Sequence, residues 1–496
     1  MEIQISKLKE TNKSLKATNP KGYILRNFQR PRCIKCSGFL FIFFGISVFL
    51  VIMKIIILTQ NMSTPILSKI AESAEASVIR NAQESFRWRD DNAEISPVNL
   101  AIGNVSLPMH PGMLKRARDI NSSEHLLSKG VVSYTATVGT DKARAGVLNI
   151  IKTLGFNIDG LYSHVTAGGT GAMELMIRAC CEKDKPLMLI EPYYTNYQEL
   201  AVKLGIPTTF VSRKLQDDGH FSLPNLDEIK SQIHKTGSNA LVVIPYDNPS
   251  GQFLPQSVLV EIAKICVENN IWMISDEAYR GLVYTNEKPS SIWGITENEV
   301  PGITGRRISI ESVSKLFNAC GLRMGALITD NKQLHQQAVK MASPELCASV
   351  IAQYIIEALE EEDNASMTEW IEYLRGYYKK LITSTVEAFK KRMPGLIVSS
   401  PDASIYFVID FKNIDPNFDA KTFVNFCAKE GRVNEVQIEG KPGTLFLAPM
   451  AGFYSSPNSG KTQMRVAAVD TEERMLLAPE LCARLFEQYR KEQRHN

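Results

Sequence analysis

The sequence lacks the features that mark several large classes of protein. Its nine cysteines have no metal-ligand spacing in the motif-rich middle of the chain, so no zinc or other metal site is predicted. Basic and acidic residues nearly balance, which leaves a formal net charge of +3. Because no basic patch is interleaved with aromatic residues in the globular part of the chain, we expect no nucleic-acid partner. No internal repeat or low-complexity segment is visible, which excludes a repeat architecture.

What is present is the composition of a sizeable globular protein. The chain has 496 residues, 44% hydrophobic and 22% charged, enough for two packed domains plus extensions. Strand-like runs alternate with helical patterns from about residue 120 to 330, which predicts an α/β domain with a mostly parallel sheet and helices on both faces. The later residues favour a smaller α+β domain that is completed by residues near the N-terminus. We expect five segments: a basic tail (1–36), a transmembrane segment (37–58), an N-terminal arm (59–118), a large domain (119–330) and a small domain (331–496).

The first sixty residues differ from the rest of the chain. Residues 38–58 are apolar except for Ser47 and Lys54, and a helix of this length covers about 31 Å, the thickness of a bilayer's hydrocarbon core. Residues 1–36 carry nine Lys or Arg and two Glu, which predicts a cytosolic N-terminus. The sequence therefore predicts a single-pass membrane protein anchored through residues 38–58. A cleaved signal peptide is one alternative, and a cytoplasmic protein that starts at Met62 is another.

Polar residues follow three predicted strands at the points where the strands end. Apolar runs of four to eight residues are typical of strands buried on both faces, and such runs cover 241–244 and 271–274. A third probable strand, from Arg307 to Ser312, leads into Lys315. Ligands of open α/β sheets gather beyond the carboxyl ends of the strands. We therefore expect one site built from all three strand ends. The polar residues concerned are Asn248 after the first run, Asp276 and Tyr279 after the second, and Ser312 and Lys315 at the end of the third strand.

Lys315 is the centre of the most informative stretch, Ser312 to Gly325. A lysine amine can form a Schiff base with an aldehyde cofactor, and Ser312 and Arg323 on either side could bind the phosphate of pyridoxal 5'-phosphate. A single lysine is more often a solvated surface charge, so this interpretation depends on the other motifs.

The ordered set of motifs resembles the class I/II aminotransferase family, aspartate aminotransferase-like enzymes of fold type I that depend on pyridoxal phosphate. In that family an Asn before Pro, an Asp with a Tyr three residues later, and a Ser-x-x-Lys followed by an Arg occur in this order. The turn from Ala167 to Ala172, which follows a predicted strand, resembles the family's phosphate-binding turn. The other matching residues are Asn248, Asp276, Tyr279, Ser312, Lys315 and Arg323.

The resemblance implies how the cofactor ring would be held. Asp276 would face the pyridine nitrogen and keep it protonated, so that the ring withdraws electrons from the substrate's Cα. Asn248 and Tyr279 would hydrogen-bond the phenolic oxygen. Tyr194 would stack on the ring.

The phosphate would be held at a helix N-terminus, where free N–H groups favour an anion. The resemblance assigns this task to Arg323 and Ser312 and to the backbone of Gly169 and Thr170. Tyr134 matches a tyrosine that reaches the phosphate in the neighbouring subunit, which implies a homodimer with shared active sites.

The substrates implied are an amino acid and a 2-oxo acid. Arg465 would pair with the substrate's α-carboxylate through two parallel hydrogen bonds, and Gly103 would lie beside the substrate pocket. Arg280 could face an acidic substrate side chain or point to solvent, and no motif identifies the amino donor. Lys315 would both anchor the cofactor and act as the general base of a transamination.

Other functions remain open at this point. The same residues could serve a lyase, a decarboxylase or an enzyme like aminocyclopropane-carboxylate synthase. A non-catalytic sensor or scaffold with the same fold is the opposing class, although a sensor would not need Lys315, Asp276 and Arg465 together.

Overall fold

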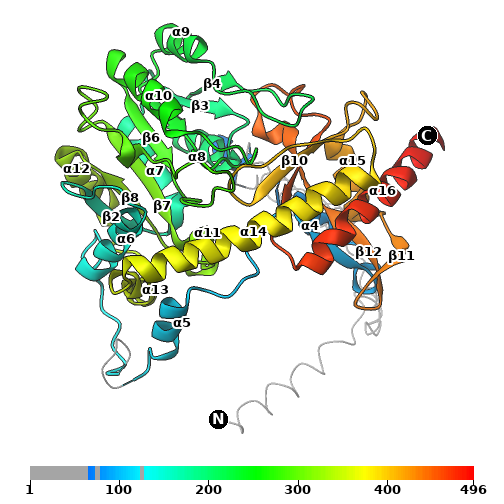
Figure 1. Ribbon diagram of the computed structural model, residues 1–496, viewed down its shortest axis with the longest axis horizontal. Coiled ribbons are helices and arrows are strands. Elements are labelled where there is room, and N and C mark those ends of the chain that lie inside the picture. The colour runs from blue at the N-terminus through cyan, green and yellow to red at the C-terminus, as the bar shows by residue number, and fades with distance from the viewer. Residues whose placement is uncertain (1–64, 73–76, 78, 123–127, 496) are drawn as a thin grey trace, which may run out of the picture. The chain divides into compact units, whose positions relative to one another are not determined.

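The computed structural model describes residues 65–72, 77, 79–122 and 128–495. The chain divides into two compact units, Met1–Ser73 and Ala74–Asn496. In the first unit, the described residues include the short helix α3 (Lys69–Glu72). All the structure that follows belongs to the second unit (Figure 1).

A mixed sheet of seven strands forms the centre of the second unit, in the order β2-β8-β7-β6-β5-β3-β4. Strand β8 runs antiparallel to both of its neighbours, β2 and β7, and the pairs from β7 to β4 are parallel. The predicted α/β fold with a mostly parallel sheet is therefore confirmed. The strands are β2 (Tyr162–Thr166), β3 (Leu187–Glu191), β4 (Thr208–Ser212), β5 (Ala240–Val243), β6 (Trp272–Asp276), β7 (Arg307–Ser312) and β8 (Gly325–Thr329).

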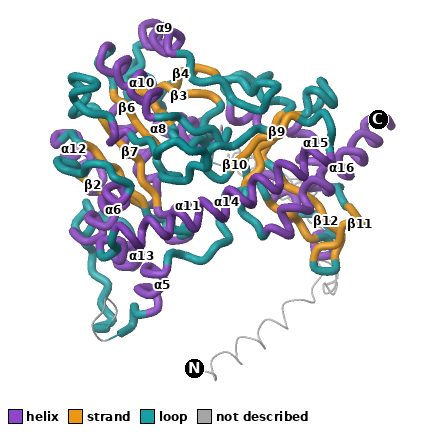
Figure 2. Tube along the Cα trace, viewed as in Figure 1, coloured by secondary structure: helices purple, strands orange, loops and turns teal. Residues whose placement is uncertain are grey.

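Helices cover both faces of this sheet, because neighbouring residues of its strands enter different hydrophobic cores. Leu187 and Leu189 of β3 pack in one core with α7, α8 and α12, whereas Met188 and Ile190 belong to the other core, which includes residues of α6, α9 and α10. Figure 2 shows the helices on either side of the strands. These helices are α6 (Asp141–Thr153), α7 (Gly168–Cys180), α8 (Thr195–Leu204), α9 (Leu226–Thr236), α10 (Gln256–Glu268) and α12 (Lys332–Ala342).

Local sequence signals set where several helices begin and end. The Asn225 side chain caps α9 by accepting hydrogen bonds from the N–H groups of Asp227 and Glu228, and Gly237 ends the helix with a φ of 68°. Asp363 caps the longest helix, α14 (Asn364–Arg392), in the same way, by accepting from the N–H of Ser366 at 2.8 Å. The ends of these helices therefore follow from the residues at their caps.

Two smaller sheets are built from the C-terminal third of the chain and one strand near its start. The four-stranded sheet has the order β13-β14-β10-β9, and the three-stranded sheet the order β1-β12-β11. Strand β1 pairs in parallel with β12, so a strand that precedes the large sheet in the sequence completes a sheet built from C-terminal strands. The strands are β1 (Ser96–Asn99), β9 (Ile397–Val398), β10 (Tyr406–Asp410), β11 (Val433–Ile438), β12 (Lys441–Phe446), β13 (Ala448–Pro449) and β14 (Gln463–Ala467).

Helix α14 packs against α6 at one end of its course and against α16 and β9 at the other, so it links the large sheet to the small ones (Figure 1). The remaining helices are α4 (Asn81–Arg87), α5 (Pro111–Arg118), α11 (Val313–Leu316), α13 (Val350–Ile356), α15 (Ala420–Lys429) and α16 (Glu472–His495). The 3-10 turns are η1 (Asn92–Glu94), η2 (Ile292–Gly294), η3 (Cys320–Leu322), η4 (Ser343–Glu345), η5 (Glu357–Glu360) and η6 (Met450–Phe453).

The prediction of a single-pass membrane protein is not supported, and we withdraw it. Within the described ranges, no helix combines the length and the apolar character needed to cross a bilayer. The segment 38–58, to which the prediction referred, lies outside those ranges, as does Met62.

Candidate active site

The predicted cofactor residues converge on one cavity at the carboxyl ends of β5, β6 and β7. Its volume is about 130 Å³. It also contains Cys320, from the segment that follows the lysine. Tyr134 does not line this cavity, and its side chain is 76% exposed. The predicted residues in the lining are Gly169, Thr170, Tyr194, Asn248, Asp276, Tyr279, Ser312, Lys315 and Arg323.

Lys315 lies in the single turn of α11, directly after β7. The Ser312 side chain caps this turn by accepting a hydrogen bond from the Ser314 N–H at 3.1 Å. The Lys315 Nζ donates to the carbonyl oxygen of Gly103. A Cβ atom at residue 103 would overlap the Tyr406 hydroxyl and stand 3.3 Å from Nζ. Gly103 therefore allows the lysine amine and a tyrosine hydroxyl to share this side of the cavity.

Asp276 is a buried carboxylate at the end of β6, with 4% of its surface exposed. Its Oδ2 accepts a hydrogen bond from the Tyr197 hydroxyl at 2.9 Å, and its Oδ1 accepts one from the Ala278 N–H at 3.2 Å. Burial raises the pKa of this carboxyl to about 6, and the negative charges of Glu311 and Asp247 act in the same direction. No ion pair joins Asp276 to a cation in the described part of the chain, so a cationic N–H in the cavity would be its natural partner.

The turn between β2 and α7 brings backbone N–H groups close to Arg323. Gly168 has a φ of 76°, and a Cβ atom there would lie 2.6 Å from the Arg323 Nη2. A Cβ atom at Gly325 would lie 2.6 Å from the Gly169 nitrogen. The guanidinium of Arg323 donates to the Cys320 carbonyl oxygen at 3.1 Å and forms no ion pair among the described residues. These glycines thus create a cationic cradle at a helix N-terminus, which suits a phosphate.

Arg465 of β14 is 1% exposed and lies next to the cavity. Its guanidinium stands 4.3 Å from the ring centre of Tyr406 and 5.2 Å from that of Phe453. Nη1 donates to the Asn248 Oδ1 at 2.9 Å and Nη2 donates to the Ala101 carbonyl, whereas Nε is buried and has no partner among the described residues. A buried guanidinium with a free N–H suits a carboxylate ligand.

Comparison with known proteins identifies the family. The family described as aminotransferase class I and II matches residues 95–473. The chain belongs to this family. It is a pyridoxal-phosphate-dependent aminotransferase, as the sequence predicted, and its relatives do not favour the lyase or decarboxylase alternatives.

Several relatives of this aminotransferase have curated names. A probable aspartate/prephenate aminotransferase of Aquifex aeolicus is 25% identical over 328 residues, which are 65% of this chain and 78% of the relative. An aspartate aminotransferase of Thermotoga maritima is 24% identical, over 76% of this chain and 91% of the relative.

Solved structures share the fold of this aminotransferase. The aspartate aminotransferase from Thermus thermophilus with maleate superposes with a TM-score of 0.68 at 20% identity, and covers 85% of this chain and 100% of its own. The N-succinyldiaminopimelate aminotransferase from Mycobacterium tuberculosis gives a TM-score of 0.69 at 20% identity, with the same coverage of both chains.

The cavity of this aminotransferase fits the cofactor of its family. Pyridoxal phosphate carries an aldehyde, a ring nitrogen that can be protonated and a phosphate. The cavity presents an amine at Lys315, a buried unpaired carboxylate at Asp276 and the cationic cradle around Arg323. Each group of the cofactor therefore has a chemical counterpart in the lining.

Sequence reasoning missed two tyrosines beside the site and did not place Arg280. Tyr197 donates to Asp276, and the Tyr406 hydroxyl lies 2.8 Å from that of Tyr279. Arg280 faces neither substrate nor solvent, because it is 1% exposed and bound by Glu277 and Glu311. The spacing of Tyr197, one helical turn after Tyr194, is the sequence feature that could have predicted its place beside the site.

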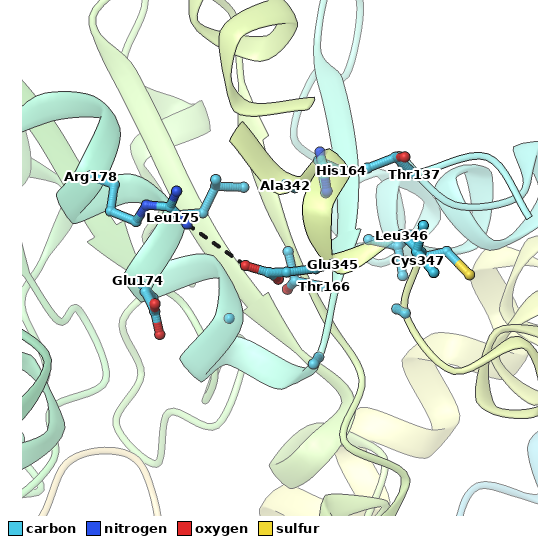
Figure 3. Close-up of a pocket in the computed structure, with 14 residues that line it drawn as sticks. Thr137, His164, Thr166, Glu174, Leu175, Arg178, Ala342, Glu345, Leu346 and Cys347 are labelled. Atoms are coloured by element: carbon cyan, nitrogen blue, oxygen red, sulfur yellow. Dashed lines mark ion pairs between the residues drawn. The ribbon is translucent and has the colours of Figure 1, made fainter. Parts of the chain in front are cut away.

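A second cavity, of about 160 Å³, is lined in part by Thr166 and Ala167, at the turn between β2 and α7 (Figure 3). Arg178 and Glu345 line this cavity as an exposed ion pair, 3.7 Å apart. His164 also lines it, and its buried Nδ1 has no hydrogen-bond partner within the described ranges. Burial lowers the pKa of His164 to about 4, so this histidine is neutral near pH 7. The cavity contains none of the predicted site residues, and we assign it no catalytic role.

Proposed function

We propose that this aminotransferase transfers the amino group of an L-amino acid to a 2-oxo acid, with Lys315 as the cofactor anchor and the proton carrier. The observation that supports this assignment most strongly is the convergence of Lys315, Asp276 and Arg323 on one cavity beside Arg465. Because relatives are named aspartate aminotransferases, aspartate is the first amino donor to test.

Bound pyridoxal phosphate would supply an aldehyde and an electron-withdrawing ring. Asp276 would bind the ring N–H and hold its proton, since an anion favours the protonated nitrogen. Tyr279 and Asn248 would donate hydrogen bonds to the phenolic oxygen, and Tyr194, at the start of α8, would lie against the ring face. These contacts fix the ring's orientation and its charge.

The phosphate would be bound by Arg323, by the Ser312 hydroxyl and by the N–H groups of Gly169 and Thr170. This anchor retains the cofactor while the lysine amine is free. Freed Lys315 Nζ would then take the proton from the substrate's Cα and deliver it to the cofactor's C4' carbon. The carbonyl of Gly103, which accepts a hydrogen bond from Nζ, would orient the amine between transfers.

Arg465 would bind the substrate's α-carboxylate. Its Nε has no partner in the part of the chain that the structure describes, and the two aromatic rings beside the guanidinium exclude water from it. A carboxylate gains more from a planar guanidinium in such a dry site than from a mobile ammonium, because two of its oxygen lone pairs are bound at once.

We also propose a homodimer in which Tyr134 reaches the phosphate of the partner's site. The segment that carries Tyr134 is unusually apolar for an exposed one: Val131 is 63% exposed and Val132 is 50% exposed. A second copy would cover these side chains. The family's usual assembly supports the same arrangement.

We keep the predicted domain boundaries in this proposal, without the withdrawn transmembrane segment 37–58. Residues 119–330 would form the cofactor-binding domain, to which α12 also belongs because it packs on the large sheet, and the later residues would form the small domain, with part of 59–118 added to it. The parallel pairing of β1 with β12 supports the last point.

The test is a single-turnover assay on the full-length protein loaded with pyridoxal phosphate. Single L-amino acids are added, and pyridoxamine phosphate and the matching 2-oxo acid are measured by mass spectrometry. We expect both products in equal amounts with the true donor, and neither with Lys315→Ala. Release of ammonia or carbon dioxide without pyridoxamine phosphate would contradict a transamination.

A further inference from the structure

Tyr197 touches the carboxylate that would face the cofactor, although it does not line the cavity itself. We propose that Tyr197 is a positioning residue, which keeps Asp276 ionised and aimed at the cofactor's ring nitrogen. This inference rests on the proposed function, because it takes from it the place of Asp276 opposite the ring.

The contact is direct and lies entirely inside the protein. The Tyr197 hydroxyl donates to the Asp276 Oδ2 at 2.9 Å, and neither side chain is more than 4% exposed. The N–H of Ala278 donates to the other oxygen, so each carboxylate oxygen is held by one donor. Two donors on different elements, α8 and the turn after β6, fix the plane of the carboxylate. The remaining lone pairs are then available to an N–H from the cavity.

The start of α8 carries two side chains of the site at once. Tyr194 precedes the first residue of the helix and Tyr197 follows one turn later, so both point to the same side. Their rings are 6.4 Å apart at 83°, an edge-to-face contact. Tyr197 also packs in the core formed by α7, α8 and β3, which leaves its hydroxyl little freedom. One helix start therefore positions the residue proposed to stack on the ring and the residue that braces Asp276.

The charges around Asp276 explain why it needs this donor. Burial raises the pKa of the carboxyl, and Glu311 from β7 and Asp247 from the loop after β5 raise it further. The hydrogen bonds from Ala278 and Tyr197 lower it. Lys315 and Arg323 line the same cavity. Asp247 forms an ion pair with Arg213, and Glu311 forms one with Arg280. Of the groups that face Asp276, Tyr197 is the side chain that opposes protonation by a hydrogen bond.

Tyr197 itself remains a donor across the working pH range. Burial and the neighbouring Asp276 raise the pKa of its hydroxyl well above the usual value, so the proton stays on the tyrosine oxygen. Loss of this donor should raise the pKa of Asp276. As the pH falls, the Asp276 carboxyl would then take up its proton at a higher pH than in the natural protein. Below that pH the ring nitrogen would have no anionic partner.

The experiment compares Tyr197→Phe with Tyr193→Phe in the full-length protein. Tyr193 is the matched control, since it is buried four residues earlier and stacks on Phe210 rather than touching Asp276. The dissociation constant of pyridoxal phosphate is measured by absorbance from pH 5 to 9, and unfolding of the cofactor-free protein is followed in parallel. We expect about tenfold weaker binding for Tyr197→Phe near pH 7.5, from the loss of one hydrogen bond to a charged group. The pH at which affinity falls should rise by about one unit.

The same change in a second variant distinguishes a role in positioning Asp276 from a role in packing the core. In Asp276→Asn, the added Tyr197→Phe change should no longer alter cofactor affinity, because the charge it supports is gone. If Tyr197→Phe does not fold, 4-aminophenylalanine at position 197 keeps an N–H donor at the end of the same ring, and it should keep a pH midpoint near that of the natural protein.

The outcomes are distinct from those of the proposed function. A protein that binds no pyridoxal phosphate contradicts the proposed function itself. A protein that binds it through Lys315, but whose Tyr197→Phe variant keeps the natural affinity and pH midpoint, contradicts only the role of Tyr197. A variant that loses stability and keeps both binding values contradicts it as well, because the hydroxyl would then be purely structural.

Discussion

Arg465 donates from Nη1 to the Asn248 Oδ1 at 2.9 Å, and both residues are buried. This bond joins β14 of the four-stranded sheet to the loop beyond β5 of the seven-stranded sheet. The residue proposed to bind the substrate's carboxylate is therefore tied to a residue proposed to bind the cofactor. Substrate and cofactor would be aligned through one hydrogen bond between two sheets.

Replacing Arg465 with lysine should separate substrate binding from cofactor binding. Arg465→Lys keeps the charge and loses the paired donors, so we expect kcat/KM to fall about tenfold to a hundredfold, mostly through KM. Cofactor affinity should change little. Arg484→Lys, at a surface ion pair with Glu480, is the control and should leave all three values unchanged. An equal fall in kcat/KM in the two variants would contradict the assignment of Arg465 to the substrate's carboxylate.

The cradle around Arg323 predicts a sharp difference between two glycines. Gly168→Ala places a Cβ against the Arg323 guanidinium at a φ of 76°, so we expect cofactor affinity to fall at least tenfold. A Cβ at Gly321, two residues before Arg323, meets nothing within 4 Å. Gly321→Ala should therefore bind pyridoxal phosphate normally in the same titration. Normal affinity in Gly168→Ala would show that this turn does not hold the phosphate.

The buried ionic cluster of Arg280, Glu277 and Glu311 predicts a pH-dependent loss of stability. Burial already raises the pKa of Glu277 to about 7. Arg280→Met removes the only cation of this cluster, so the Glu277 carboxyl should hold its proton to a still higher pH in the folded state. When the pKa of a carboxyl is higher in the folded state than in the unfolded state, the folded protein becomes less stable as the pH rises from the unfolded-state pKa to the folded-state pKa. We expect a loss of about 3–5 kcal/mol at pH 8 that shrinks toward pH 5.

Denaturant unfolding at both pH values measures this effect. Lys380→Met, which removes an exposed pair with Glu472, is the control and should cost less than about 1 kcal/mol at either pH. A loss in Arg280→Met that is the same at pH 5 and pH 8 would contradict the argument from the buried carboxyls.

Several site residues were predictable because their evidence is local in the sequence. Asp276 and Tyr279 follow an apolar strand at fixed spacing, and Ser312, Lys315 and Arg323 lie within one short stretch. An apolar strand that ends in a polar residue can be recognised from a short stretch of sequence, and the position of the site follows from it.

The residues that were missed depend on contacts between distant parts of the chain. Tyr197 and Asp276 are 79 residues apart, and Tyr406 and Tyr279 are 127 apart. A buried tyrosine that donates to a carboxylate has the same local pattern as one that only fills a core. Arg280 lies beside a motif, yet its burial depends on Glu311 in the next strand of the sheet, 31 residues away.

Cysteine labelling offers a test of the cavity that does not depend on turnover. Cys320 lines the proposed site and Cys347 lines the second cavity, and both are partly exposed. The other described cysteines are buried, and burial raises the pKa of Cys181 and Cys266 to about 12. Among the described cysteines, we expect iodoacetamide to label Cys320 and Cys347, and pyridoxal phosphate to protect Cys320 alone. Peptide mass spectrometry measures the labelling of both cysteines. Protection of Cys347 and not of Cys320 would place the cofactor in the second cavity and contradict the proposed site.

The central claim is that Lys315 holds the cofactor, and borohydride reduction of the loaded full-length protein tests it most directly. Reduction makes the bond between a lysine amine and pyridoxal phosphate permanent, so peptide mass spectrometry can locate it. We predict a phosphopyridoxyl group on Lys315, and none at residue 315 or elsewhere in Lys315→Ala under the same conditions. A label on other lysines with Lys315 unmodified would contradict the account.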